Sequence, residues 1–118
     1  MDPVSLIAFI FGLLIMTLVA GFLAPMARDR KLARNAAIGI KTRHTLASDE
    51  VWLAGHQQAA PLVAVASWTG WATLAIAAVL WGSGQLALSF AATGAGYLAV
   101  ITLLMVSASR ANKAARSI

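Results

Sequence analysis

The stretch NAAIGIKTRHTLASDEVWLAGH, residues 35–56, is the polar segment around which the rest of the chain is arranged. It holds both histidines, two of the four acidic residues and two of the nine basic residues. Outside residues 27–58 and the two chain ends, the sequence is almost free of charge. We therefore expect apolar helices that hold one ordered polar segment.

The composition is that of a membrane protein. Hydrophobic residues make up 60% of the chain and charged residues 11%, whereas soluble domains are about 45–50% apolar and about 25% charged. A core of this size cannot hide the excess, because a chain of this length leaves roughly a third of its surface exposed. The sequence thus predicts a single all-α domain, residues 1–118, in a lipid environment.

Three uncharged runs are long enough to cross a bilayer, at about residues 4–24, 59–81 and 86–107. At about 1.5 Å per residue, the shortest of them matches a hydrocarbon core of about 30 Å. The first run is followed by bases and not preceded by them, so we expect a retained helix and not a cleaved signal peptide. The link GSGQ, residues 82–85, predicts an antiparallel hairpin of the last two spans.

The basic residues predict the topology. Six lie in residues 27–58 and three in residues 110–116, but none lies in residues 1–4 or 82–85. The positive-inside rule places the loop 27–58 and the C-terminus in the cytoplasm and the N-terminus outside. Bases that flank a span also suit anionic lipid head groups, and we expect this of Arg28, Arg30, Lys31 and Arg34. Residues 28–38 are compatible with a helix that continues the first span or lies on the head groups.

A helix start follows within the polar segment. Ser48 is a suitable N-cap, and Asp49 and Glu50 then lie in the first turn, where the helix dipole favours negative charge. The spacing of Asp49, Trp52 and His56 places them on one helix face. We expect this short helix of the loop to run into the second span.

Turn-forming residues precede that helix. Thr42, Thr45 and Ser48 bond readily to nearby backbone groups, and Gly39 interrupts the preceding stretch. An ordered loop is expected, in which the acids pair with Lys41 or Arg43.

Several chemistries are not indicated. Cysteine is absent, and no metal-binding spacing such as HExxH occurs around His44 and His56, so we expect no catalytic residue, metal or cofactor. No Asp, Glu, Lys, Arg or His lies within a span, which argues against an ion-driven transporter. No aromatic residues interleave the basic cluster, as a single-strand nucleic-acid binder would need, so we expect no direct nucleic-acid binding.

Small residues and tryptophans suggest how the helices pack. Ala91, Ala95 and Ala99 recur at four-residue steps beside Ala92 and Gly96, a spacing that lets helix backbones approach closely. We expect this face to contact the second helix or another copy of the chain. Because Trp68 and Trp71 lie deep in the second span, we expect them to pack between helices.

The polar segment resembles the SdpI family of bacterial membrane proteins. The family's signature reads like N…GIRT..T..S.E.W…(H/N), set between a first span and a helical hairpin. The matching positions are Asn35, Ile38, Gly39, Ile40, Lys41, Thr42, Thr45, Leu46, Ser48, Asp49, Glu50, Val51, Trp52 and His56. Lys41 replaces the family's arginine, and the chain holds only the three-span module.

The resemblance implies a multi-pass protein of the bacterial cytoplasmic membrane. Family members protect a cell from a secreted peptide toxin and relay its presence to a repressor held at the membrane. In this interpretation the loop binds a partner through Asn35, Gly39, Lys41, Thr42, Thr45, Ser48, Asp49, Glu50, Trp52 and His56. Two alternatives stay open: an accessory subunit that packs on a larger membrane protein, and a protein that binds or transports lipid. A homo-oligomer is compatible with each.

Overall fold

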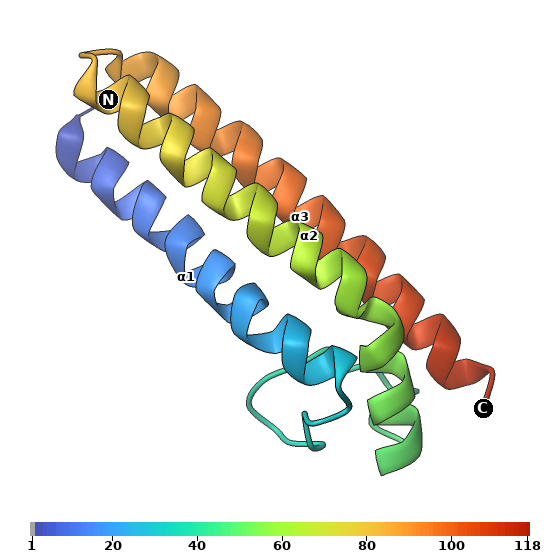
Figure 1. Cartoon of the computed structure of the whole chain (residues 1–118). Coiled ribbons are helices and arrows are strands. Elements are labelled where there is room, and N and C mark those ends of the chain that lie inside the picture. The colour runs from blue at the N-terminus through green and yellow to red at the C-terminus, as the bar shows by residue number, and fades with distance from the viewer. Residues whose placement is uncertain (1) are drawn as a thin grey trace.

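The computed structural model describes residues 2–118, in which three helices and no strand occur (Figure 1). Helix α1 spans Pro3–Arg28, α2 spans Asp49–Gly82 and α3 spans Leu86–Arg116. Each of the three helices described over residues 2–118 is long and apolar enough to cross a membrane. The prediction of an all-α fold with three candidate spans is therefore confirmed.

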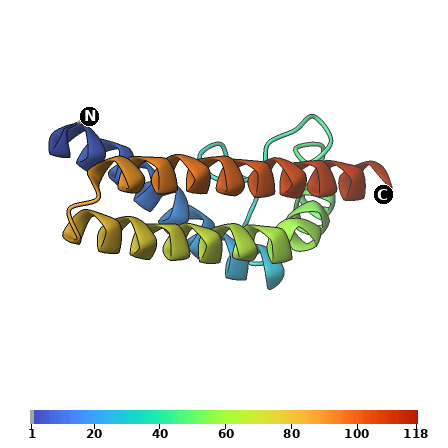
Figure 2. The ribbon, with the colours of Figure 1, turned by 90° about the horizontal axis from the view of Figure 1, so that it is seen from above.

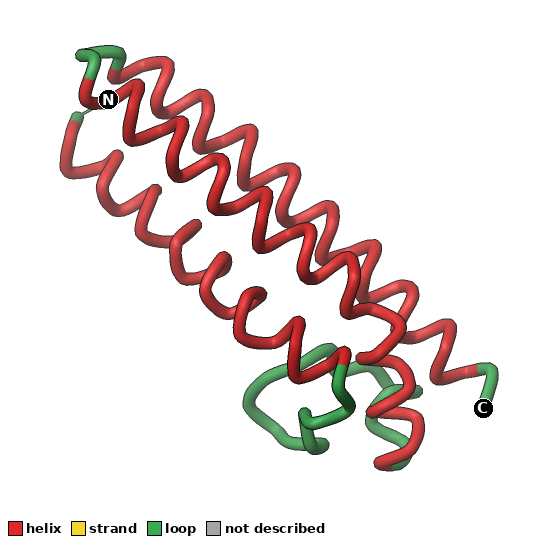
Figure 3. Tube along the Cα trace, viewed as in Figure 1, coloured by secondary structure: helices red, strands yellow, loops and turns green. Residues whose placement is uncertain are grey.

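The helices lie side by side in an elongated bundle of 52 × 21 × 19 Å (Figures 1 and 2). A tight turn joins α2 to α3, in which Gln85 donates its N–H to the Leu80 carbonyl at 2.8 Å. Gly84 adopts a left-handed φ of 76° there, as the second residue past a helix end commonly does. The long connection between α1 and α2 folds back beneath the opposite end of the bundle (Figure 3).

Helix α1 passes through Pro25 and ends at Arg28. Arg30 turns the chain with φ 57°, and the Lys31 N–H bonds back to the Met26 carbonyl at 2.8 Å. Residues 31–35 then have no regular structure. The helix-compatible stretch 28–38 therefore does not continue α1, because this turn closes the helix with a Schellman-type hydrogen bond.

The short helix expected in the loop is not a separate element. Its residues are the first turns of α2, whereas residues 29–48 form turns, bends and irregular backbone. Ser48 is the N-cap and accepts the Val51 N–H at 3.2 Å, so the predicted start of the helix is confirmed. Helix α2 changes direction in its first third (Figure 1), and Pro61 within it is the cause expected for a kink.

Small side chains form the contact between α2 and α3. Thr73 and Ala77 of α2 lie against Gly96 and Ser89 of α3. The buried Ser67 and Gly70 of α2 instead contact Thr17 of α1. Gly96 lies against the Thr73 side chain and Ala92 is half-buried, whereas Ala91, Ala95 and Ala99 are exposed.

The two deep tryptophans lie elsewhere than expected. Trp68 is 75% exposed and Trp71 is 43% exposed, so neither indole is enclosed between helices. Small residues occupy the buried stripe of α2 and let the backbones approach closely, which leaves the large indoles outside.

The fully buried hydroxyls of the helices donate to backbone carbonyls, as expected for polar groups in a lipid solvent. Thr17, Thr73 and Thr93 each donate to the carbonyl four residues earlier in the same helix. Ser67 donates to the Thr17 carbonyl of α1 at 3.2 Å, and Ser89 donates to the Ala77 carbonyl of α2 at 2.8 Å. These two bonds tie neighbouring helices together.

Candidate functional site

The centre of the polar region is a pair of buried rings on the first turns of α2. The rings of Trp52 and His56 are in contact, with centroids 4.1 Å apart and an interplanar angle of 33°, and these residues are 0% and 1% exposed. The Trp52 indole donates its N–H to the Leu32 carbonyl at 2.9 Å. A residue that follows the end of α1 is thereby fixed to α2.

His56 fixes a second point of the loop. Its Nε2 accepts the backbone N–H of Ile40 at 2.8 Å, and its Nδ1 lies 2.8 Å from the Trp52 carbonyl. Because a backbone N–H only donates, Nε2 carries no hydrogen and Nδ1 donates to the carbonyl. Both partners therefore select the neutral imidazole with its hydrogen on Nδ1.

The surroundings of His56 favour the same protonation state. His56 precedes the apolar run 59–81 and so lies outside the membrane-crossing part of α2. Burial lowers the pKa of His56, and this effect outweighs the hydrogen bond to Trp52, which raises the pKa. The ring is thus a neutral acceptor at neutral pH.

Gly39 fits flat against both rings. It has a φ of +123°, and a Cβ at this position would lie 2.8 Å from two carbons of the Trp52 ring and 2.9 Å from Nε2 of His56. Both the conformation and the space therefore require glycine. The glycine lets the loop approach closely enough for Ile40 to reach His56.

Two threonines close the next turn of the loop. The Thr45 hydroxyl accepts the Thr42 N–H at 2.8 Å and donates to the Ile40 carbonyl at 2.8 Å. The Thr42 hydroxyl in return accepts the Thr45 N–H at 3.1 Å. Thr45 is buried beside Gly55, whose missing side chain also allows contact with the Ala111 carbonyl of α3. The turn is thus packed against α2 at the point where α2 meets α3.

Asn35 and Arg34 order the remainder of the loop. The Asn35 side chain accepts the N–H groups of Ala37 and Ile38, each at 2.8 Å. Arg34 donates to the Leu46 carbonyl at 3.0 Å and forms an ion pair with Asp49 at 3.1 Å. The predicted ion pair of Asp49 with Lys41 or Arg43 is therefore wrong, because the folded loop brings Arg34 to Asp49 instead. This exposed pair contributes about 0–1 kcal/mol.

The predicted loop residues thus fall into an inner group and an outer group. The inner group is buried or half-buried and consists of Asn35, Gly39, Thr42, Thr45, Ser48, Trp52 and His56. The outer group is exposed and consists of Lys41, Asp49 and Glu50. Arg28, Arg30, Lys31 and Arg34 are exposed as well. Within residues 2–118 no cluster of three or more His, Asp or Glu side chains occurs that could hold a metal ion.

The sequence does not predict the hydrogen-bond partners of the Trp52 and His56 rings. The partner atoms are the backbone carbonyl of Leu32 and the backbone N–H of Ile40, and backbone groups leave no signature in a sequence. The one available signal was Leu32, an isolated large apolar residue among bases, which is 4% exposed.

Helices of membrane-crossing length with a polar loop folded onto the end of one of them define a multi-pass membrane protein. The model of the SdpI/YfhL protein family matches residues 31–109, and the chain belongs to this family. The match includes the loop, α2 and most of α3, and it begins after α1. No curated protein and no solved structure matches the chain.

Proposed function

We propose that this SdpI-family chain is a non-catalytic immunity or signalling protein that presents its 35–56 loop to a partner as a preformed surface. Family membership supports this proposal, because immunity to a peptide toxin and signal relay are the roles that the family resemblance implies. The observation that carries it is the docking of the loop on Trp52 and His56. A rigid surface binds a partner without a large ordering cost.

The inner and outer groups of the loop have different roles in this proposal. Trp52, His56 and Gly39 hold the backbone in place and act as positioning residues. Lys41 and Glu50, both exposed, offer charges of opposite sign to the partner. The partner is a secreted peptide toxin or a repressor that is held at the cytoplasmic face of the membrane.

A protection assay tests the outer group. Toxin-sensitive bacteria that express the chain are challenged with medium that contains a secreted peptide toxin, and survival is counted. Truncating a hot-spot contact residue costs about 2 kcal/mol or more, about 30-fold in affinity. Glu50→Gln and Lys41→Gln should each reduce survival at least about tenfold, whereas Arg116→Gln in the C-terminal tail should not.

A second measurement separates recognition from folding. Limited proteolysis should cut the Trp52→Ala loop faster than the unchanged loop, because the Leu32 carbonyl loses its partner. The Glu50→Gln loop should stay as resistant as the unchanged one. Full protection by both Glu50→Gln and Lys41→Gln would show that this surface is not the recognition face.

A further inference from the structure

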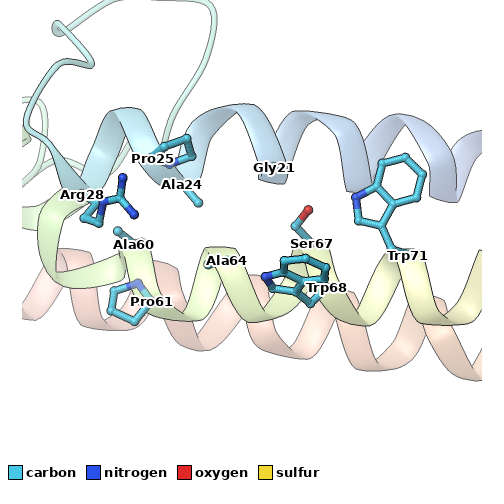
Figure 4. Close-up of a pocket in the computed structure, with 10 residues that line it drawn as sticks. All are labelled: Gly21, Ala24, Pro25, Arg28, Ala60, Pro61, Ala64, Ser67, Trp68 and Trp71. Atoms are coloured by element: carbon cyan, nitrogen blue, oxygen red, sulfur yellow. The ribbon is translucent and has the colours of Figure 1, made fainter.

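A groove runs between α1 and α2, separate from the 35–56 loop (Figure 4). It has a volume of about 550 Å³, a size in the range of ligand-binding clefts. Small residues hollow it out, because Gly21 and Ala24 of α1 face Ala60 and Ala64 of α2. From Ala60 to Trp71 the groove follows α2 for about 16 Å.

The walls of this groove are apolar over most of its length. Pro25 and Pro61 line it on opposite helices, and Trp68 and Trp71 stand at its far end (Figure 4). The hydroxyl of Ser67 also lines it but already donates to the Thr17 carbonyl. The groove therefore suits a chain of methylene groups better than a polar solute.

A guanidinium lines one end of the groove. Arg28 is the charged residue among those described that line it (Figure 4). Asp29 accepts from its Nε at 3.0 Å and its Nη2 at 3.3 Å, which leaves Nη1 to bind an anion. The Arg30 guanidinium lies nearby, because it donates to Gln57, whose amide donates to the Arg28 carbonyl.

We propose that this groove binds an anionic glycerophospholipid, with the phosphate at Arg28 and one acyl chain along the groove toward Trp71. The charge distribution identifies this occupant, since a phospholipid carries charge at one end and an apolar chain at the other. A transmembrane helix of a partner has no corresponding need for a cation at one end. The proposal does not depend on the proposed function of the loop.

Native mass spectrometry of the full chain in detergent micelles tests the proposal. The purified protein is titrated with dioleoyl phosphatidylglycerol and, in parallel, with dioleoyl phosphatidylcholine, which has the same acyl chains. We expect one saturable lipid adduct that prefers phosphatidylglycerol. Arg28→Gln should weaken it about tenfold, because the variant loses the charge-assisted hydrogen bond to the phosphate. Arg43→Gln, an exposed loop base outside the groove, should leave the adduct unchanged.

A second pair of variants tests the acyl site. Ala64→Phe fills the groove and should abolish the adduct, whereas Ala75→Phe on an exposed position of the same helix should not. Equal binding of the two lipids, or an adduct that survives Ala64→Phe, would overturn the proposal. A dimer of the unchanged chain that becomes monomeric on Ala64→Phe would likewise overturn it and assign the groove to a second copy.

Discussion

Two side chains one helical turn apart organise the whole polar loop. Trp52 binds a carbonyl 20 residues earlier in the chain, and His56 binds an N–H 16 residues earlier. Each bond closes a long loop, and buried polar groups are costly to leave without partners. The loop is therefore held by few side chains, and its order depends strongly on the protonation state of one of them.

Acid should release the loop from His56. The pKa of His56 is lowered below its ordinary value of 6.5, so the neutral ring stabilises the fold above pH 6.5. This contribution decreases as the pH falls below 6.5 toward the lower pKa of the folded state. Protection of the Ile40 amide against hydrogen exchange should fall by up to about tenfold per pH unit in this range.

Two variants identify the group responsible. His56→Gln should remove the pH dependence of the Ile40 protection factor, because no titrating ring remains at this position. His44→Gln should retain it, since His44 makes none of the bonds that hold Ile40. A protection factor that stays constant from pH 7 to pH 5 in the unchanged chain would contradict the assignment.

For single residues, the sequence predicts which side chains share a helix face but not which atoms they bond to. The spacing of Trp52 and His56 predicts that both rings lie on one side of a helix, and the two rings are indeed in contact there. Nothing in the sequence indicated that the rings are buried, because a Trp–His pair is equally compatible with an exposed recognition face. The sequence predicts that Gly39 interrupts the preceding stretch, but the close contact of Gly39 with the rings follows only from the folded backbone.

Among the elements, α2 exceeds the length that a bilayer requires. It has 34 residues, about 51 Å, against a hydrocarbon core of about 30 Å. The excess is the polar end that carries Trp52 and His56. The same helix thus serves as a span and as the support for the loop.

The contact between α2 and α3 should depend on Gly96. A side chain at this position would overlap the Thr73 side chain, and overpacking costs about 1–3 kcal/mol. Gly96→Leu should therefore lower the melting temperature of the detergent-solubilised chain, measured by circular dichroism. Ala95→Leu, at the exposed neighbour, should leave it nearly unchanged. Equal melting temperatures would show that this packing contributes little.

The sequence left the packed face of α3 ambiguous. The alanines at 91, 95 and 99 have the regular spacing of a packing stripe, yet they are exposed. The buried stripe carries Ser89 and Thr93, whose hydroxyls bond to backbone carbonyls. Residue size alone does not distinguish these two faces, and the polar groups that need partners decide between them.

Across the whole molecule, polar and basic groups lie at one end of the bundle. The loop and the C-terminus lie together there, whereas the N-terminus and the turn between α2 and α3 lie at the other end (Figure 1). The division into spans and a polar loop was predictable, because charge and hydropathy mark it directly. The path of the loop was not, since it follows from hydrogen bonds between distant segments.

Orientation in the membrane is testable because the chain contains no cysteine. Ser83→Cys in the short turn should react with a membrane-impermeant maleimide in intact cells. Arg43→Cys in the loop should react only once inverted vesicles expose the cytoplasmic face. These outcomes follow from the excess of bases in the loop and tail. The reverse labelling pattern would place the loop outside and remove the basis for a cytoplasmic partner.

The bend of α2 near Pro61 separates a short arm held by the loop from a long arm that crosses the lipid. A partner that displaced the loop would rotate the short arm about this bend, relative to the long arm. An event at the membrane surface would then reach the interior of the bilayer as mechanical movement, without any chemical step.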